Sequence, residues 1–449
     1  MNGKGSLDDL PAMVFVPERG DSLHDHPFYR MAVHDGRQVR APAPEELCPL
    51  PPGSDIFLLP GRLAVGLNPE TGGPEVFRGG FAVAAFASPG YLRLALPAVS
   101  RLEDASMLPQ FAYAPIGYRR GRFYTAAVRV DRSHRQDPRR FDLARIGRRA
   151  RALVRQHPRN RLIAHLEHCA MVYGCRAAQN FFLAREECPL PASPTCNATC
   201  IGCLSHQPPG GVPASHERIA FTPTPDEIAE TALIHIRRVR RAVVSFGQGC
   251  EGEPLLVADV LRDAIRSIRK HTGRGTIHLN TNGSRPDAVE ALCEAGLDSI
   301  RLSVNSFRRA WYEAYYRPRG YSLDHVIASG RIVRESGGFV SVNLLVFPGV
   351  TDRPEDLAAT VGAIRAIGVD LVQMRNLNMD PDLYLQSLPA LDDGPPLGLI
   401  EVLRRLRQEL PSLRFGYFNP PVRSLVRQRR AGITPWTKVH PWRHESGPG

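Results

Sequence analysis

The chain has 449 residues, enough for two or three domains, and its composition of 43% hydrophobic and 23% charged residues is ordinary for a globular protein. No apolar run is long enough to cross a bilayer, and no basic stretch followed by an apolar one begins the chain, so we expect a cytoplasmic protein without a secretory signal. The net charge of +12 favours a solvated arginine-rich surface and is also compatible with a polyanion partner.

The first part of the chain is predicted to be an accessory β-rich domain over residues 1–135. Short apolar stretches at residues 55–59, 80–86 and 121–131 are bounded by glycine and proline, a pattern typical of strands. Residues 136–187 follow as a helical connector, with helices expected at 141–156 and 160–173.

From residue 188 to residue 385 strands and helices alternate. Strands are expected at 241–247, 276–283, 299–306, 339–349 and 369–376, and helices at 226–238, 256–270, 287–295, 323–336 and 354–367. With one more strand at or before a cysteine cluster, this makes about six parallel βα units. The predicted fold class is therefore α/β, a partial (β/α)6 barrel of the TIM type behind the β-rich domain, with a C-terminal helix and tail over 386–449. Chemistry in such barrels lies at the carboxyl ends of the strands.

Three of the nine cysteines stand within eight residues, in the segment CNATCIGC. Cys196, Cys200 and Cys203 could hold three irons of a four-iron cube and leave the fourth iron open to a ligand. A zinc site completed by His206, or simply buried thiols, are the alternatives from spacing alone.

This loop resembles the signature of the radical S-adenosylmethionine superfamily, and the segment after it resembles that family's partial barrel. Further motifs follow in the family's order. CEGEPLL (250–256) resembles a Gly-Glu-Pro element, NTNG (280–283) ends the third strand, SVNS (303–306) ends the fourth, and QMRN (373–376) lies on the sixth. The resemblance covers about residues 188–380.

The resemblance implies a [4Fe-4S] cluster on Cys196, Cys200 and Cys203, which are the predicted catalytic and metal-binding residues. With S-adenosylmethionine it implies a 5′-deoxyadenosyl radical that abstracts hydrogen from a substrate, and a reductant such as flavodoxin or ferredoxin. The carboxylate of the Gly-Glu-Pro element would pair with the ammonium group of the cofactor. The predicted cofactor-binding residues are Gly252, Glu253, Pro254, Asn282, Ser303, Asn305, Asn343, Gln373 and Met374.

Some features depart from the family pattern or leave alternatives open. Gly202 stands where family members often carry an aromatic residue against adenine, so adenine must be held otherwise. Cys169, Cys175 and Cys188 could hold an auxiliary cluster or could simply pack between helices, and no cysteine follows Cys293.

The remaining motifs and the substrate are less specific. FPGVTD (347–352) could face a substrate or cap a helix, and YEAYYRPRGY (312–321) could bind a base or a peptide or pack on the barrel. The separate β-rich domain favours a protein or peptide substrate, with RNA next because of the positive charge. A non-catalytic iron–sulfur or zinc protein in electron transfer or assembly is the alternative function.

Overall fold

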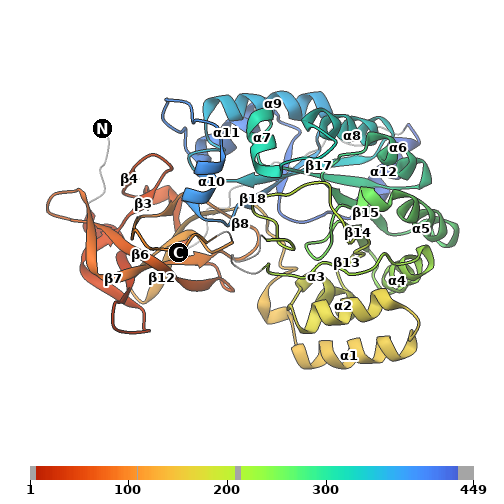
Figure 1. Cartoon of the computed structure of the whole chain (residues 1–449), viewed down its shortest axis with the longest axis horizontal. Coiled ribbons are helices and arrows are strands. Elements are labelled where there is room, and N and C mark those ends of the chain that lie inside the picture. Colours follow the sequence, from red (N-terminus) through yellow and green to blue (C-terminus); the bar gives the residue numbers. More distant parts are fainter. Residues whose placement is uncertain (1–6, 109, 208–213, 433–449) are drawn as a thin grey trace.

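The computed structural model describes residues 7–108, 110–207 and 214–432, and Figure 1 shows an antiparallel β region beside a parallel sheet with helices around it. None of the helices in the described part of the chain has the length and apolarity needed to cross a bilayer.

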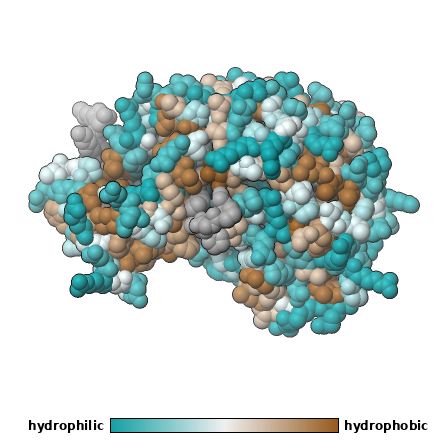
Figure 2. All heavy atoms as spheres, in the orientation of Figure 1, coloured by the Kyte–Doolittle hydropathy of each residue, from teal (hydrophilic) through white to brown (hydrophobic). Residues whose placement is uncertain are grey.

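The N-terminal region is built on an antiparallel sheet. In the described residues this sheet has nine strands: β1 (Ala12–Pro17), β2 (His24–Met31), β5 (Leu47–Pro49), β6 (Asp55–Leu67), β7 (Pro74–Phe86), β8 (Tyr91–Arg93), β10 (Val99–Arg101), β11 (Ala114–Arg119) and β12 (Arg122–Arg129). A small sheet joins β3 (Val33–His34), β4 (Val39–Arg40) and β9 (Leu96–Pro97), and short 3₁₀ turns cover Leu7–Asp9 and Pro44–Glu46. The long β6–β7 ribbon exposes Phe57, Leu58, Val76 and Phe86, and Figure 2 shows apolar atoms among hydrophilic ones over this part of the molecule.

Helices connect this region to the parallel sheet. After a 3₁₀ turn at Pro138–Arg140 come α1 (Leu143–Gln156), α2 (Arg161–Met171) and α3 (Arg176–Leu183). Asp142 and Asn160 cap the first two through side-chain oxygens that accept from Arg145 N and Ile163 N.

The parallel sheet runs in chain order from β13 to β19. Its strands are β13 (Glu187–Pro189), β14 (Val243–Phe246), β15 (Thr276–Thr281), β16 (Ser299–Val304), β17 (Phe339–Val346), β18 (Leu371–Asn376) and β19 (Arg414–Gly416). The remaining helices in the described part of the chain are α4 (Pro225–Arg238), the 3₁₀ turn η4 (Pro254–Val257), α5 (Ala258–His271), α6 (Pro286–Ala295), α7 (Arg309–Tyr316), α8 (Leu323–Glu335), α9 (Pro354–Ile367), α10 (Pro381–Ser387), α11 (Leu399–Glu409) and α12 (Arg423–Arg430). Figure 1 shows α5, α6, α8 and α9 along the outer face of the sheet.

Hydrogen bonds between strands that are not neighbours show that this sheet is strongly curved. Asn419, just after β19, donates to Glu187 on β13 at 2.8 Å and accepts from Gln373 on β18 at 2.9 Å. Arg301 on β16 donates across β17 to Gln373 at 3.2 Å. The concave face is therefore polar, while alternate residues such as Ile300 and Val372 point outward into the helix-covered core.

The predicted fold class, an α/β partial barrel of the TIM type behind a β-rich N-terminal region, is confirmed. The described sheet has seven strands where about six were expected, because β19 lies in the segment predicted as a C-terminal helix and tail. The domain limits at residues 135, 187 and 385 stay predictions, and the last 17 residues of that tail, 433–449, lie outside the described residues.

A buried ion pair fixes the N-terminal region to the barrel. Arg62 lies 2.5 Å from Asp380, and both side chains are almost fully buried. Asp380 also accepts from Leu108 N at 3.1 Å and from the Tyr113 hydroxyl at 3.2 Å. The β-rich region thus packs on the segment that follows β18.

Candidate functional site

The CNATCIGC loop follows β13 and is held by the end of α7 and the residues after it. Main-chain N–H groups of Thr199 and Ile201 donate to the carbonyls of Tyr316 and Tyr315, both at 3.1 Å. In return Arg319 donates to the carbonyls of Asn197 at 2.9 Å and Cys196 at 3.0 Å. The segment YEAYYRPRGY therefore packs on the barrel and positions the cysteine loop, a role that its composition did not reveal.

The three thiols of the loop are half-buried. Burial raises the pKa of the Cys196 thiol and raises that of Cys200 well above the usual range. Around the third thiol, Arg218 Nη2 lies 3.6 Å from Cys203 Sγ and the Ser205 hydroxyl lies 3.7 Å from it. A guanidinium and a hydroxyl thus lie beside the third sulfur of the loop.

The spacing of the thiols argues against a single ion. One tetrahedral zinc ion draws its sulfur ligands to within about 4 Å of one another. Cys196, Cys200 and Cys203 do not form a group of ligand atoms within 4.8 Å in the described chain, and His206 is exposed and joins no such group. A multi-iron cube binds each thiolate at a different iron, so this more open arrangement of soft ligands fits a cluster.

The loop after β14 is tied to the residues that lead into the cysteines. Glu251, which the sequence did not single out, is buried and accepts from the N–H groups of Ala192 at 2.8 Å, Ser193 at 3.1 Å, and Gly247 and Gln248 at 2.7 Å each. Burial nevertheless raises the pKa of Glu251 to about 7. This carboxylate therefore joins the loop after β14 to the segment that precedes the cysteines.

Gly252 lies against the residue before the first cysteine. Its N–H donates to Ser193 O, and the next N–H donates to Thr195 O, both at 2.7 Å. A Cβ on Gly252 would stand 1.9 Å from Thr195 O. Only glycine permits this approach, which explains the residue type physically.

The carboxylate of Glu253 makes hydrogen bonds within the protein, and its pairing with the ammonium group of a ligand stays a prediction. It accepts from Leu255 N at 3.1 Å, Asn282 N at 2.8 Å and the Thr281 hydroxyl, and the side chain is buried. Burial raises its pKa to about 7. In the structure the carboxylate thus joins the β14 and β15 loops, while Pro254 begins the short turn η4.

One of the predicted cofactor residues contacts the cysteine loop, and two others are neighbours on adjacent strands. Asn282 donates its amide to Asn197 Oδ1 at 2.8 Å, so it contacts the loop directly. Ser303 and Asn343 are paired neighbours on β16 and β17. Asn343 Oδ1 is buried without a hydrogen-bond partner, which is costly unless a ligand supplies a donor.

The other three sit in different surroundings. Asn305 donates to Trp311 O at 3.1 Å and to the Tyr384 hydroxyl at 3.2 Å, so it supports α7. Gln373 is held between Arg301 and Asn419. Met374 lies in the apolar core, on the opposite side of β18 from Gln373.

Gly202 gives room to an aromatic residue from another element. A Cβ at this position would lie 2.8 Å from the Tyr315 hydroxyl. Tyr315 on α7 is buried and packs edge-on against Tyr384. Gly202 thus leaves room for the Tyr315 hydroxyl beside the loop.

The N-terminal region also reaches the site. Gln110 donates its amide to the carbonyl of Cys203, and Gln207 donates to the same oxygen at 2.7 Å. FPGVTD packs against the same region, because a Cβ on Gly349 would lie 2.4 Å from Gly36 Cα. Its Asp352 accepts from Gly349 N at 2.7 Å within the turn.

The upstream cysteines are divided between two surroundings. Cys188 is buried in β13, where its thiol faces the Pro189 carbonyl at 3.6 Å. Cys169 is grouped with His165 and Cys250 and not with Cys188. Cys175 begins α3 nearby and donates its N–H to Cys169 O at 2.9 Å.

Comparison with known proteins identifies the family of the barrel segment. Residues 190–361 match the model of the Radical SAM superfamily. GTP 3′,8-cyclase 2 of Mycobacterium tuberculosis is 34% identical over 215 residues, which are 48% of this chain and 56% of that protein. The FeMo cofactor biosynthesis protein NifB of Klebsiella pneumoniae is 24% identical over 217 residues, 43% of each chain. The chain thus spans about half the length of the curated relatives it matches.

Solved structures show a more distant likeness. Methylornithine synthase is 16% identical with a TM-score of 0.35, and the match covers 56% of this chain and 70% of that one. HydG, a maturase of the [FeFe]-hydrogenase, is 15% identical with a TM-score of 0.38, covering 63% and 67%. The Radical SAM family uses a [4Fe-4S] cluster together with S-adenosylmethionine, and the donor set of the loop fits that cluster.

Proposed function

We propose that this chain, whose residues 190–361 match the model of the Radical SAM superfamily, is an enzyme that holds a [4Fe-4S] cluster on Cys196, Cys200 and Cys203 and uses S-adenosylmethionine. The observation that carries this proposal is the thiol loop at the edge of the barrel, anchored by α7 on one side and by the Gly252 loop on the other. The chemistry that the pair of cofactors supplies when bound is a 5′-deoxyadenosyl radical for hydrogen abstraction.

The residues around the loop would orient the cofactor. Gly252, Glu253 and Pro254 bring their main chain next to the cysteines, and the Glu253 carboxylate keeps that loop against β15. Asn282 borders the loop through Asn197, and the unpartnered Oδ1 of Asn343 is an acceptor for a ligand N–H or O–H. Tyr315, in the space left by Gly202, closes the apolar side of the loop.

The roles of the other predicted residues follow from their contacts. Ser303 would contact the same ligand from the strand beside Asn343. Asn305 would support α7, and the main chain at Met374 would border adenine. Gln373 would act on the cofactor through the position it gives to its neighbours. A reductant of the flavodoxin or ferredoxin type and a cytoplasmic location belong to this proposal.

For the substrate, a protein or peptide is the first candidate and RNA the next. The β-rich N-terminal region supports it through its contact with the loop, since Gln110 donates to Cys203 O. The exposed apolar side chains of the β6–β7 ribbon offer a surface for an extended segment.

A second candidate, a small anionic substrate, is favoured by two arginines on the concave face. Arg301 and Arg375 both donate to Gln373 Oε1, at 3.2 and 3.3 Å. Burial, and after it the Arg375 charge, lowers the pKa of Arg301 to about 9. Neither guanidinium has an ion pair in the described chain, and the Nε of each is buried without a partner. Two cations that share one neutral acceptor favour a phosphate or carboxylate beside them. Among such anions we propose a nucleotide, because the relatives from Mycobacterium are named GTP 3′,8-cyclase 2.

The test of the enzyme proposal is reductive cleavage of S-adenosylmethionine. Protein reconstituted anaerobically with iron and sulfide and reduced with dithionite should give 5′-deoxyadenosine. Cys200→Ala should lose both the iron and the product, while Cys48→Ala, in the N-terminal sheet, should keep both. An intact cluster without 5′-deoxyadenosine would contradict the proposal and favour an electron-transfer or assembly protein.

The small anion is distinguished from the peptide and RNA candidates in the same assay. A peptide or RNA substrate should accelerate 5′-deoxyadenosine formation without dependence on the arginine pair. If the substrate is a small anion, nucleoside triphosphates should accelerate it in the parent enzyme and not in Arg301→Gln. A nucleotide effect that survives Arg301→Gln would contradict the anion site.

A further inference from the structure

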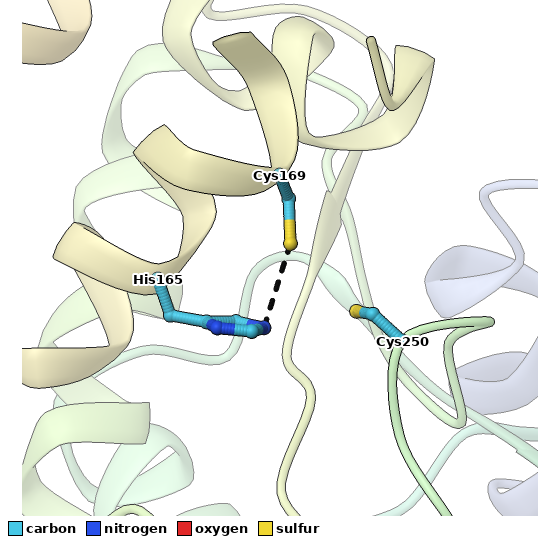
Figure 3. A group of neighbouring side chains, drawn as sticks. All are labelled: His165, Cys169 and Cys250. Atoms are coloured by element: carbon cyan, nitrogen blue, oxygen red, sulfur yellow. Dashed lines mark hydrogen bonds between the residues drawn. The ribbon is translucent and has the colours of Figure 1, made fainter. Parts of the chain in front are cut away.

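A second group of metal-ligating side chains lies outside the thiol loop and is not used by the proposed reaction. His165 Nε2, Cys169 Sγ and Cys250 Sγ all lie within 4.8 Å of one another, a compactness that no other group of three His, Cys, Asp or Glu side chains reaches in the described chain. Figure 3 shows His165 and Cys169 on one helix, with Cys250 approaching from a loop on the opposite side.

The local structure holds these three side chains ready. His165 and Cys169 are four residues apart on α2, which places them on one face of the helix. Their Nε2 and Sγ atoms are 3.4 Å apart. The Cys250 carbonyl accepts from Ile219 N at 2.8 Å. The carboxylate of the adjacent Glu251 binds the same loop to Ala192 N. Cys169 and Cys250 are buried, and His165 is half-buried.

We propose that His165, Cys169 and Cys250 form a second metal site, which binds one divalent cation of the zinc class. Zinc takes thiolate and imidazole ligands at about 2.3 and 2.0 Å in a tetrahedron, which puts neighbouring ligand atoms about 3.5–3.8 Å apart. The observed Nε2–Sγ separation of 3.4 Å is close to that value. Three protein ligands leave one position of the tetrahedron for water.

The site differs from the thiol loop in the spacing of its ligand atoms, which distinguishes a single-ion site from a cluster site. The loop thiols Cys196, Cys200 and Cys203 are spread apart, whereas these three ligand atoms converge. The two sites are nevertheless linked by sequence and by contact, because Cys250 stands two residues before Gly252, and Ser205 Oγ, which neighbours Cys203 Sγ, faces Glu251 O at 3.4 Å. A bound ion would cross-link α2 to the loop that supports the cysteines.

The experiment uses the full chain with Cys196, Cys200 and Cys203 all changed to alanine, so that neither a cluster nor a stray ion can occupy the loop. This parent variant, purified anaerobically and dialysed against zinc, should retain about one zinc per chain by mass spectrometry of metals. With cobalt in place of zinc, it should show a thiolate-to-metal charge-transfer band and the visible bands of a tetrahedral ion.

Further changes in that background test the ligands. Cys169→Ser, Cys250→Ser and His165→Ala should each lower metal retention at least tenfold, whereas His165→Cys, which supplies another soft ligand, should keep it. Cys175→Ser is the matched control, because this thiol borders the group without joining it, and Cys293→Ser is a distant one. Circular dichroism confirms the fold of each variant.

Several results would overturn the proposal. They are a parent variant without metal, metal that persists in both Cys169→Ser and Cys250→Ser, and a Cys169–Cys250 disulfide found by mass spectrometry in anaerobic protein. Loss of metal in Cys175→Ser would overturn the three-ligand assignment. Because this readout needs no cluster, it stands apart from the test of S-adenosylmethionine cleavage.

Discussion

The contact between Gly252 and Thr195 offers a sharp test of how the cysteine loop is supported. A Cβ at residue 252 would lie 1.9 Å from Thr195 O and 2.3 Å from Thr195 C, and both neighbours are main-chain atoms that no rotamer change can move. Gly252→Ala must therefore separate the two segments. The hydrogen bonds from Gly252 N to Ser193 O and from Glu253 N to Thr195 O would be lost or lengthened.

The size of the effect follows from these contacts. Each main-chain hydrogen bond contributes about 1 kcal/mol, and forced overpacking costs about 1–3 kcal/mol. We expect Gly252→Ala to weaken the local structure by about 3–5 kcal/mol, which is more than a hundredfold in an equilibrium constant. Since Thr195 precedes Cys196, the loss should appear as weaker retention of iron.

The assay compares iron retention and 5′-deoxyadenosine formation in reconstituted protein with the melting temperature of the unreconstituted chain. Gly249→Ala is a control in the same loop, because among the described residues its Cβ would meet only Leu204 Cδ1 at 3.4 Å, an ordinary contact. Gly252→Ala should lose iron and product, and Gly249→Ala should keep both. Equal behaviour of the two variants would refute the argument from close approach.

Three further predictions concern packing and charge. Gly202→Ala should destabilise the protein by about 1–3 kcal/mol. Adding Tyr315→Phe to this variant should recover part of that loss, because it removes the hydroxyl that lies 2.8 Å from the new Cβ. Additive effects of the two substitutions in a double-mutant cycle would contradict this prediction. Asp380→Asn leaves the buried Arg62 charge uncompensated and should lower the free energy of unfolding in urea by about 3–5 kcal/mol. The variant should also be cleaved faster by a protease between the β-rich region and the barrel. Unchanged proteolysis would contradict the view that this ion pair holds the two parts together. Burial raises the pKa of Asp356 to about 7, so the folded state keeps a proton that the unfolded chain releases near pH 4, and stability falls as the pH rises from about 4 to about 7. Asp356→Asn should therefore gain more in melting temperature at about pH 8 than at about pH 5. A gain that does not depend on pH would refute this sign.

The barrel could be predicted from the sequence because its signals are local. Apolar strands alternate with amphipathic helices, and each strand and helix between residues 226 and 376 that this pattern predicted has a counterpart in the structure. The missed strand β19 has only three residues, Arg414–Gly416, and its pairing with β18 depends on the sheet already formed. Too few residues carry the pattern for periodicity to reveal it.

The supports of the site could not be predicted in the same way, because they join residues far apart in the chain. Gln110 reaches Cys203 from 93 positions away, and Arg62 pairs with Asp380 across 318 positions. Nothing in the local pattern of either residue indicates its partner. Glu251 is a similar case, since a lone glutamate beside a cysteine gives no sign that four main-chain N–H groups converge on it.

Glu253 has a structural role that the motif alone does not indicate. The sequence predicts a carboxylate that pairs with the ammonium group of a ligand, and in the structure this carboxylate also accepts from Leu255 N, Asn282 N and the Thr281 hydroxyl. These three hydrogen bonds hold the β14 and β15 loops together, so the carboxylate contributes to stability whether or not a cofactor is bound. Glu253→Gln keeps the shape but turns one acceptor into a donor facing N–H groups. We therefore expect it to lower the melting temperature even without S-adenosylmethionine, whereas a purely ligand-binding carboxylate would change only the affinity for the cofactor.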